Sequence, residues 1–172
     1  RGMVGFGAIM KFNLKFIGGD NPKLKMRIHL VDQERALKVG RALVAFMNRK
    51  PSYGVAANQF GIMERVCAAK IQEPGRSGST IRIFIDPQIT NRSGSQTNIE
   101  GCLSWPGVTG KVKRPNELTV DWLAFKILDS GKTVFVRQSE SFKGFQAAIL
   151  EHEIDHLDGI RCIDKMKNKK TR

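Results

Sequence analysis

Apolar and polar residues alternate along this chain with two different periods, and each period predicts a type of element. Between residues 33 and 48, apolar side chains such as Val39, Leu43 and Met47 recur three and four positions apart, which places them on one face of a helix. Asp32, directly before this segment, is a residue type that caps helix N-termini. We therefore expect a helix from residue 33 to about residue 48.

Other segments alternate at every second residue, a pattern typical of strands with one buried face. The segments expected to form strands are residues 62–71, 81–86, 118–122 and 134–136. A Gly-containing turn at residues 129–132 joins the last two and predicts a hairpin. Asp86-Pro87 is expected to end the second strand, because proline cannot donate a ladder hydrogen bond. We expect a turn at residues 73–79 and a polar loop at residues 91–97.

A second helix is predicted for residues 145–158. Phe145, Ala148, Ile149 and His152 follow helical spacing, and Gly159 is suited to the left-handed residue that often follows a helix. Several strands with hairpin connections between two helices predict the α+β class. We expect a single domain in which mainly antiparallel sheets pack around the helix at residues 145–158.

The length and composition fit one globular domain. The chain has 172 residues, of which 41% are hydrophobic and 26% charged, enough to build one core. We expect the domain to span residues 10–165, with residues 1–9 as an expression remnant or extension and residues 166–172 as a basic tail. No apolar run approaches the roughly 18 residues of a membrane helix, so no membrane association is expected.

Cysteine content and charge indicate the compartment and the kind of partner. Three cysteines do not make a disulfide framework, which predicts reduced thiols in a cytoplasm-like compartment. The formal net charge is +13, so an acidic partner or surface is expected. The tail is the one concentrated basic segment, and we expect it to be frayed and solvated. Contact with ribosomal RNA is the alternative.

Two of the three histidines stand in an H-E-x-x-H run within the second predicted helix. His152 and His156 are four residues apart, so both imidazoles project from one face and can hold one metal ion. Glu153 and Asp155 flank that face almost symmetrically, so spacing alone leaves the catalytic base undecided. The known logic of the motif favours Glu153. The alternative is a solvated helix face without a metal.

A catalytic metal needs a third protein ligand, and two cysteines compete for this role. Cys162 follows the histidines at the distance where some H-E-x-x-H proteases place a third histidine, but few residues follow it. Cys102 lies upstream, in a strand-like segment that enters a turn, beside Gly101, which permits close approach of the backbone. Each cysteine could instead be a small buried hydrophobic residue.

Three blocks of sequence, taken in order, resemble the three motifs of the peptide deformylases. Residues 52–59, SYGVAANQ, are similar to the family pattern G-x-G-L-A-A-x-Q, with Ser52 in place of the first glycine. Residues 100–104, EGCLS, match the second motif completely. Residues 152–159, HEIDHLDG, match the third pattern H-E-x-D-H-L-x-G, and Glu151 replaces a common glutamine before it. The residues after this motif resemble the short, phage-like form that lacks the C-terminal helix.

The resemblance implies a metal and a reaction. Cys102, His152 and His156 would hold one Fe²⁺, for which Zn²⁺, Ni²⁺ or Co²⁺ can substitute, with water in the fourth position. Glu153 would act as general base and acid. The reaction would remove the formyl group from N-formylmethionyl nascent peptides and release formate.

The resemblance also implies the residues that contact the substrate. The side-chain amide of Gln59 and the backbone N–H of Leu103 would stabilise the charge that develops on the formyl oxygen. Glu100 would anchor its loop or pair with an arginine. The residues that would bind the substrate or line its site are Tyr53, Gly54, Val55, Glu100, Gly101, Phe145, Ala148 and Ile149. For the last three, plain core packing is the alternative.

Two other functions stay open from the sequence. A general H-E-x-x-H zinc peptidase would cleave internal peptide bonds and would not need Cys102. A non-catalytic, deformylase-like protein would bind the ribosome through its basic surface. For the deformylase we expect a monomer in a bacterial or phage-infected cytosol, or in an organelle.

Overall fold

The computed structural model describes residue 12, residues 14–75 and residues 77–171. The expectation for residues 1–9 therefore lies outside the described residues. In chain order the elements are η1 (Pro22–Lys25), α1 (Gln33–Met47), β1 (Gly54–Ala56), η2 (Ala57–Phe60), β2 (Val66–Gln72), β3 (Ser79–Ser93), β4 (Gln96–Cys102), β5 (Trp105–Arg114), β6 (Glu117–Ile127), β7 (Thr133–Lys143), α2 (Phe145–Leu157), α3 (Cys162–Lys165) and β8 (Lys167–Thr171).

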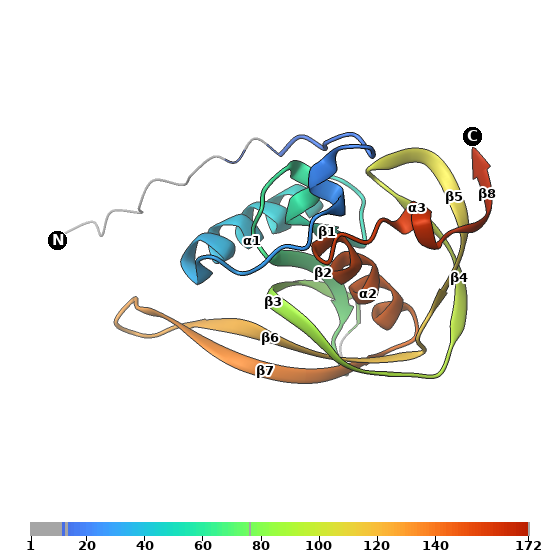
Figure 1. Ribbon diagram of the computed structural model, residues 1–172. Helices are drawn as coiled ribbons and strands as arrows, with labels where there is room; N and C mark the ends of the chain where they lie inside the picture. The colour runs from blue at the N-terminus through green and yellow to red at the C-terminus, as the bar shows by residue number, and fades with distance from the viewer. Residues whose placement is uncertain (1–11, 13, 76, 172) are drawn as a thin grey trace.

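The strands form two antiparallel sheets (Figure 1). One sheet has five strands in the order β1-β2-β3-β6-β7, and the other has three strands in the order β4-β5-β8. The predicted hairpin is present, because β6 and β7 pair along their length up to Ile127 and Thr133. The α+β class and the mainly antiparallel sheets are confirmed.

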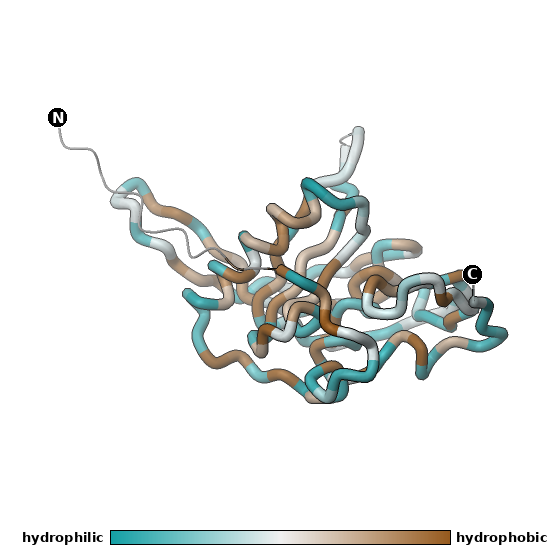
Figure 2. Tube along the Cα trace, turned by 90° about the horizontal axis from the view of Figure 1, so that it is seen from above, coloured by the Kyte–Doolittle hydropathy of each residue, from teal (hydrophilic) through white to brown (hydrophobic). Residues whose placement is uncertain are grey.

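The five-stranded sheet carries a helix on each face (Figure 1). Val66 and Ala68 of β2 belong to the core formed with α1, whereas Cys67 and Ala69 belong to the core formed with α2. A strand buried on both faces needs apolar side chains at successive positions, which explains the unbroken apolar start of β2. Figure 2 shows the hydrophobic segments gathered in the middle of the molecule, where sheet and helices meet.

Both predicted helices form, and their ends follow the sequence signals. The Asp32 side chain accepts a hydrogen bond of 2.7 Å from the Arg35 N–H and so caps α1. α2 ends at Leu157, and Gly159 has a φ of +75°. A Cβ at Gly159 would lie 2.7 Å from the backbone of Lys25. Both the left-handed conformation and this close contact require glycine.

The prediction that Asp86-Pro87 ends a strand is wrong. β3 continues to Ser93, and its pairing with β6 shifts register between Ile85 and Gln88. Asp86 has a φ of 49°, so the backbone bulges there and places Pro87 where the ladder needs no donor. The rule that proline ends a strand holds for a regular ladder, in which every second N–H must donate, and it does not hold at a bulge.

Other strand boundaries also differ from the prediction. β2 starts at Val66, so residues 62–65 are not part of it. Most of the predicted loop at residues 91–97 belongs to the end of β3 and the start of β4. The face of β4 that is turned inward carries the polar residues Asn98 and Glu100, and the residues between them on the other face are exposed. Hydrophobic alternation therefore gives no signal for this strand.

The sequence predicted that the basic tail is a frayed end, and this prediction is wrong. Residues 167–171 form β8, which pairs antiparallel with β5 although every residue of β8 is exposed. Exposed polar side chains carry no hydrophobic pattern, so the backbone hydrogen bonds to the edge of β5 were invisible in the sequence. No helix in the described part of the chain is long and apolar enough to span a membrane.

Candidate metal centre and active site

α2 lies between the two sheets and presents a different face to each (Figure 1). Leu150 and Ile154 pack into the core of the five-stranded sheet. His152 and His156 project from the opposite face toward β4 and β5. Because β4 ends at Cys102, the β4–β5 hairpin brings its thiol to the two imidazoles.

Three donor atoms from these elements converge. The ligand atoms of Cys102, His152 and His156 all lie within 4.8 Å of one another, and Cys102 Sγ is 3.2 Å from His156 Nε2. Tetrahedral coordination at usual bond lengths separates a sulfur and a nitrogen ligand by roughly 3.5 Å. The donor set therefore fits a metal ion with little movement. One thiolate and two imidazoles suit Zn²⁺ or Fe²⁺ and leave a position open.

Glu100 fixes the orientation of His152 from behind. Its Oε2 lies 2.9 Å from His152 Nδ1. Burial works to raise the pKa of Glu100, but hydrogen bonds from Arg114 and His152 lower it to about 2. An ionised carboxylate only accepts hydrogen bonds, so Nδ1 carries a proton and Nε2 is the nitrogen through which a neutral His152 would bind a metal.

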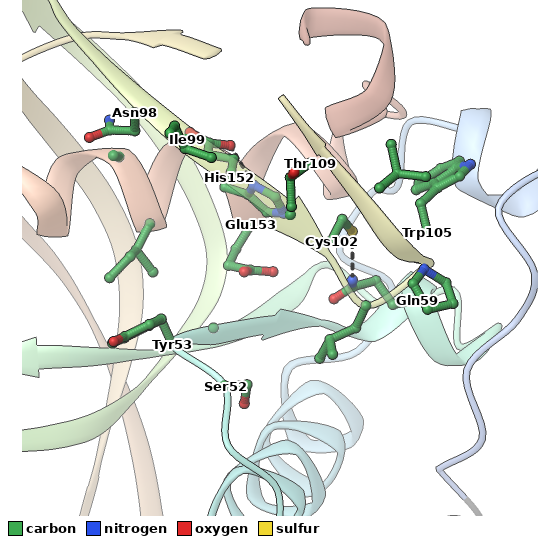
Figure 3. Close-up of a pocket in the computed structure, with 18 of the residues that line it drawn as sticks. Ser52, Tyr53, Gln59, Asn98, Ile99, Cys102, Trp105, Thr109, His152 and Glu153 are labelled. Atoms are coloured by element: carbon green, nitrogen blue, oxygen red, sulfur yellow. Dashed lines mark hydrogen bonds and ion pairs between the residues drawn. The ribbon is translucent and has the colours of Figure 1, made fainter. Parts of the chain in front are cut away.

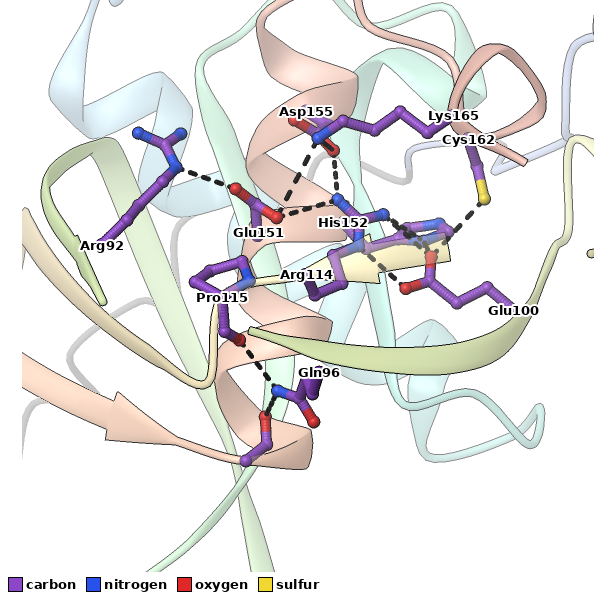
Figure 4. Close-up of polar contacts among 11 residues, drawn as sticks. Arg92, Gln96, Glu100, Arg114, Pro115, Glu151, His152, Asp155, Cys162 and Lys165 are labelled. Carbon is purple, nitrogen blue, oxygen red and sulfur yellow. Dashed lines mark hydrogen bonds and ion pairs between the residues drawn. The ribbon is translucent and has the colours of Figure 1, made fainter. Parts of the chain in front are cut away.

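Arg114, which no sequence motif singled out, connects three carboxylates behind the donor atoms (Figure 4). Its side chain is 0% exposed and holds Glu100 through two hydrogen bonds of 2.8 Å. The same guanidinium donates to Glu151 at 3.2 Å and to Asp155. Glu151 and Asp155 stand four residues apart on α2, and this spacing was the one signal for a cation between them.

The structure separates the two carboxylates that helical spacing left equivalent. Glu153 lines the pocket, and its Oε2 is buried with no hydrogen-bond partner in the described chain. Burial raises the pKa of Glu153 to about 7. Asp155 instead accepts hydrogen bonds from Arg114 and Lys165, outside the pocket. Glu153 is the carboxylate placed to exchange a proton with a molecule in the pocket.

Gln59 and Leu103 both line the pocket, and Figure 3 shows Gln59 beside Cys102. The Oε1 atom of Gln59 accepts a hydrogen bond of 2.8 Å from the Ala56 N–H, which leaves Nε2 as the donor facing Cys102 Sγ at 3.5 Å. Leu103 follows Cys102 in the β4–β5 turn and lines the pocket. The Gln59 amide and the Leu103 backbone therefore lie on the side of the pocket nearest the donor atoms.

Cys162, the competing third ligand in the sequence, lies behind the pocket. Its buried thiol is 3.6 Å from Glu100 Oε2, and it is not among the pocket-lining residues. Glu100, His152 and Cys162 do form a second group of potential ligands. However, the Glu100 carboxylate is already bonded to Arg114 and to His152 Nδ1. Cys102 is the cysteine that faces the pocket.

A cavity of about 580 Å³ opens beside the donor atoms, a size that suits a short peptide or a similar ligand. It is lined by most residues predicted to contact substrate, namely Tyr53, Gly54, Glu100, Gly101, Phe145, Ala148 and Ile149. Val55 contributes no side chain, because it is buried against α1. A Cβ at Gly54 would lie 2.6 Å from Glu153 Oε1, so the close approach of β1 to α2 requires glycine.

The mouth of this cavity carries two aromatic rings. Tyr53 and Phe145 are 62% and 53% exposed, and their rings meet edge-on with centroids 4.9 Å apart. Such exposure does not fit core packing for Phe145. Ala148 and Ile149 are buried and serve both the core and the cavity wall.

Comparison with known sequences identifies the family. The family model described as polypeptide deformylase matches residues 14–172. The chain belongs to the peptide deformylase family. Peptide deformylase 1 of Clostridium perfringens is 34% identical over 154 residues, which cover 88% of this chain and 95% of that protein. The peptide deformylase of Thermomicrobium roseum is 36% identical over 159 residues, covering 88% and 84%.

Solved peptide deformylases share the fold. The Plasmodium falciparum structure is 30% identical with a TM-score of 0.73 and covers 90% of this chain and 87% of that one. A probable peptide deformylase from Synechococcus phage S-SSM7 is 28% identical with a TM-score of 0.72, covering 89% and 99%. The Met-Ala-Ser-bound Acinetobacter baumannii deformylase is 26% identical with a TM-score of 0.73, covering 89% and 98%. This peptide deformylase therefore has the enzyme's fold over most of its length.

Proposed function

We propose that this peptide deformylase removes the formyl group from N-formylmethionyl nascent peptides and releases formate. One observation carries the proposal: the donor atoms of Cys102, His152 and His156 converge in a cavity where Glu153 has a buried, unpartnered carboxylate oxygen. We propose Fe²⁺ as the ion held by these three residues, with Zn²⁺, Ni²⁺ or Co²⁺ as substitutes. Such an ion supplies Lewis-acid chemistry and makes water a stronger acid.

Glu153 carries the proton transfers in this proposal. Its carboxylate accepts a proton from the attacking water and returns it to the departing amine. Burial raises the pKa of Glu153, and a pKa nearer neutrality favours a group that both accepts and returns a proton. The attack places negative charge on the formyl oxygen. The Gln59 amide and the Leu103 backbone N–H are the donors that would stabilise it.

The substrate would lie along the free edge of β1. β1 is the outer strand of its sheet, so the backbone of Gly54 and Val55 is available to an extended peptide. The methionine side chain would enter the apolar part of the cavity near Tyr53, Phe145 and Ile149. The bound Met-Ala-Ser in the Acinetobacter baumannii relative supports a peptide of this kind.

We propose that the enzyme works as a monomer in a reducing cytosol where proteins are made. Cys67, Cys102 and Cys162 are all free thiols, as a reducing compartment requires. The thiol of Cys102 is needed in its reduced form to bind a metal.

The decisive experiment is an assay of formate release from formyl-Met-Ala-Ser by protein purified anaerobically and loaded with Fe²⁺. We expect turnover of this peptide and none of acetyl-Met-Ala-Ser, the matched control. No formate from the iron-loaded protein would refute the proposal. Cleavage of internal peptide bonds instead would identify a general peptidase.

A further inference from the structure

Four exposed lysines share one face of the three-stranded sheet. Residues that pair across an antiparallel ladder project from the same face. Lys111 of β5 pairs with Ile99 of β4 and with Lys167 of β8, and Thr109 pairs with Gly101 and with Lys170. Lys113 lies two residues beyond Lys111 on the same face. We call this set the lysine face, and its members are Lys111, Lys113, Lys167 and Lys170.

The lysine face continues directly from the pocket. Ile99, Gly101 and Thr109 belong to the same face of the sheet and also line the cavity, where Figure 3 labels Ile99 and Thr109. Gly101 has no side chain, and a Cβ there would lie 3.5 Å from Thr109 Cγ2. The cavity therefore extends across β4 at Gly101 as far as Thr109 of β5. Lys111 lies directly opposite the cavity-lining Ile99, and Lys170 lies directly opposite Thr109, each about 5 Å away on the neighbouring strand.

The positive charges of the lysine face are not neutralised by the described part of the chain. Among the described residues, the lysines that form ion pairs are Lys143 and Lys165, and neither belongs to the lysine face. Lys111 and Lys167 are directly opposite each other, an arrangement in which like charges repel. Glu100, on the neighbouring strand, points to the other face, toward Arg114. A negatively charged group on the lysine face would relieve this repulsion.

We propose that the lysine face binds acidic side chains of the substrate peptide, downstream of the residues in the pocket, and makes the enzyme prefer acidic N-terminal sequences. The inference rests on the proposed function. A cavity of about 580 Å³ holds only a short peptide, so later residues leave it across the surface. Alternate residues of an extended peptide are about 6.6 Å apart, the same spacing that separates Lys111 from Lys113 along β5.

Nucleic acid is the competing anionic partner. A phosphate backbone also attracts exposed lysines, but a nucleic-acid surface needs no connection to the pocket. Lys111 and Lys170 of the lysine face pair directly with the pocket-lining residues Ile99 and Thr109, and this continuity favours the peptide.

The test compares kcat/KM for formyl-Met-Ala-Ser-Glu-Glu-Glu with that for formyl-Met-Ala-Ser-Gln-Gln-Gln. An exposed ion pair is worth roughly 1.4- to 5-fold, so two or three pairs predict a preference for the Glu peptide on the order of tenfold. The preference should shrink toward one at about 1 M salt, where the screening length is about 3 Å.

A triple variant, Lys111→Gln with Lys167→Gln and Lys170→Gln, should lose the preference and keep wild-type kcat/KM for formyl-Met-Ala-Ser. Lys169→Gln is the matched control, on the same strand. Lys169 is the neighbour of Lys170 in β8, and successive side chains of a strand project from opposite faces, so Lys169 lies on the other face of the sheet. We expect this control to keep the full preference for the Glu peptide.

Equal kcat/KM for the two peptides at low salt would overturn the inference, and so would an equal loss of preference in the Lys169→Gln control. If the triple variant instead lost salt-dependent binding to polyuridine RNA while both peptides were cleaved equally, nucleic acid would be the partner. A lack of formate from formyl-Met-Ala-Ser would refute the proposed function instead. Equilibrium binding of the two labelled peptides to metal-loaded Glu153→Gln protein would then test the lysine face by itself.

Discussion

Two buried carboxylates on α2 show how surroundings divide roles between similar residues. Glu153 and Asp155 are each 4% exposed, and spacing placed them symmetrically about the histidine face. Asp155 accepts hydrogen bonds from Arg114 and Lys165, which occupy its carboxylate. Glu153 has a carboxylate oxygen without a partner in the described chain, and burial raises its pKa to about 7. Of the two, Glu153 is therefore the carboxylate with an oxygen free to contact a molecule in the pocket.

Glu153→Gln keeps the shape of the side chain and removes its ability to accept a proton. We expect the variant to bind metal as the wild type does and to lose about 10²–10⁴-fold in kcat, the usual contribution of general acid–base catalysis. Metal content by elemental analysis and kcat by formate release would check both parts. The matched control is Glu151→Gln, the same change two positions away at a residue that faces Arg92 and Arg114. Near-normal turnover by Glu153→Gln would contradict its role.

At the scale of elements, charge pairs hold α2 against its neighbours. Arg114 of β5 bonds Glu151 and Asp155 of α2, and Lys165 of α3 donates to Asp155 at 2.7 Å (Figure 4). Arg92 of β3 donates to Glu151 at 2.8 Å. Arg114 also holds Glu100 of β4, and so connects the helix that carries the histidines to the strand that carries Cys102.

Asp155→Asn should therefore change stability rather than chemistry. Removing one partner of a buried pair costs about 3 kcal/mol or more, and we expect the lower end because Arg114 keeps Glu100 and Glu151. Turnover at 25 °C should stay within a few-fold of wild type. Urea unfolding would measure the loss.

Asp164→Asn provides the comparison, because its half-exposed carboxylate pairs with Arg161 at the surface. This variant should lose less than about 1 kcal/mol. A loss of turnover in Asp155→Asn without a loss of stability would assign Asp155 a part in catalysis.

Elements were predictable where burial leaves a pattern. α1 and α2 have apolar faces and end signals, Asp32 and Gly159, that act locally. β5, β8 and most of β4 were missed, although the segment at Cys102 was expected to be strand-like, because exposed and polar positions in these strands hide any hydrophobic alternation. β3 was cut short at Asp86-Pro87 because a bulge is a property of the pairing with β6, which a single strand's sequence does not contain.

At the scale of the whole molecule, a bound metal would join two layers. Cys102 belongs to the three-stranded sheet, and His152 and His156 belong to the helix that packs on the five-stranded sheet. An ion that binds only the folded chain stabilises it, by about 2.7 kcal/mol at a free concentration of 100 times Kd. For a chain of this length that corresponds to roughly 5–11 °C in Tm.

Chelation should lower the Tm of wild-type protein by an amount in this range. Without a chelator, Cys102→Ser should already have about the Tm of chelator-treated wild-type protein, because one of the three metal ligands is weakened. Adding a chelator should then change its Tm little. Cys162→Ser should respond as wild type does, since its thiol faces Glu100 behind the pocket. Thermal unfolding with and without chelator would measure each. A chelator-sensitive Cys102→Ser paired with an insensitive Cys162→Ser would reverse the assignment of the third ligand.

The sequence by itself determined the two helices, the α+β class and the residues that resemble deformylase motifs. These features depend on local spacing and on residue type, which the chain carries directly. Only the tertiary structure decided which cysteine faces the pocket, which carboxylate is left unpaired, and that Arg114 lies behind the donor atoms. It also placed the basic tail beside β5, as part of a lysine face next to the pocket. Each of these depends on contacts between residues distant in sequence, and those contacts form only when the sheets and α2 pack together.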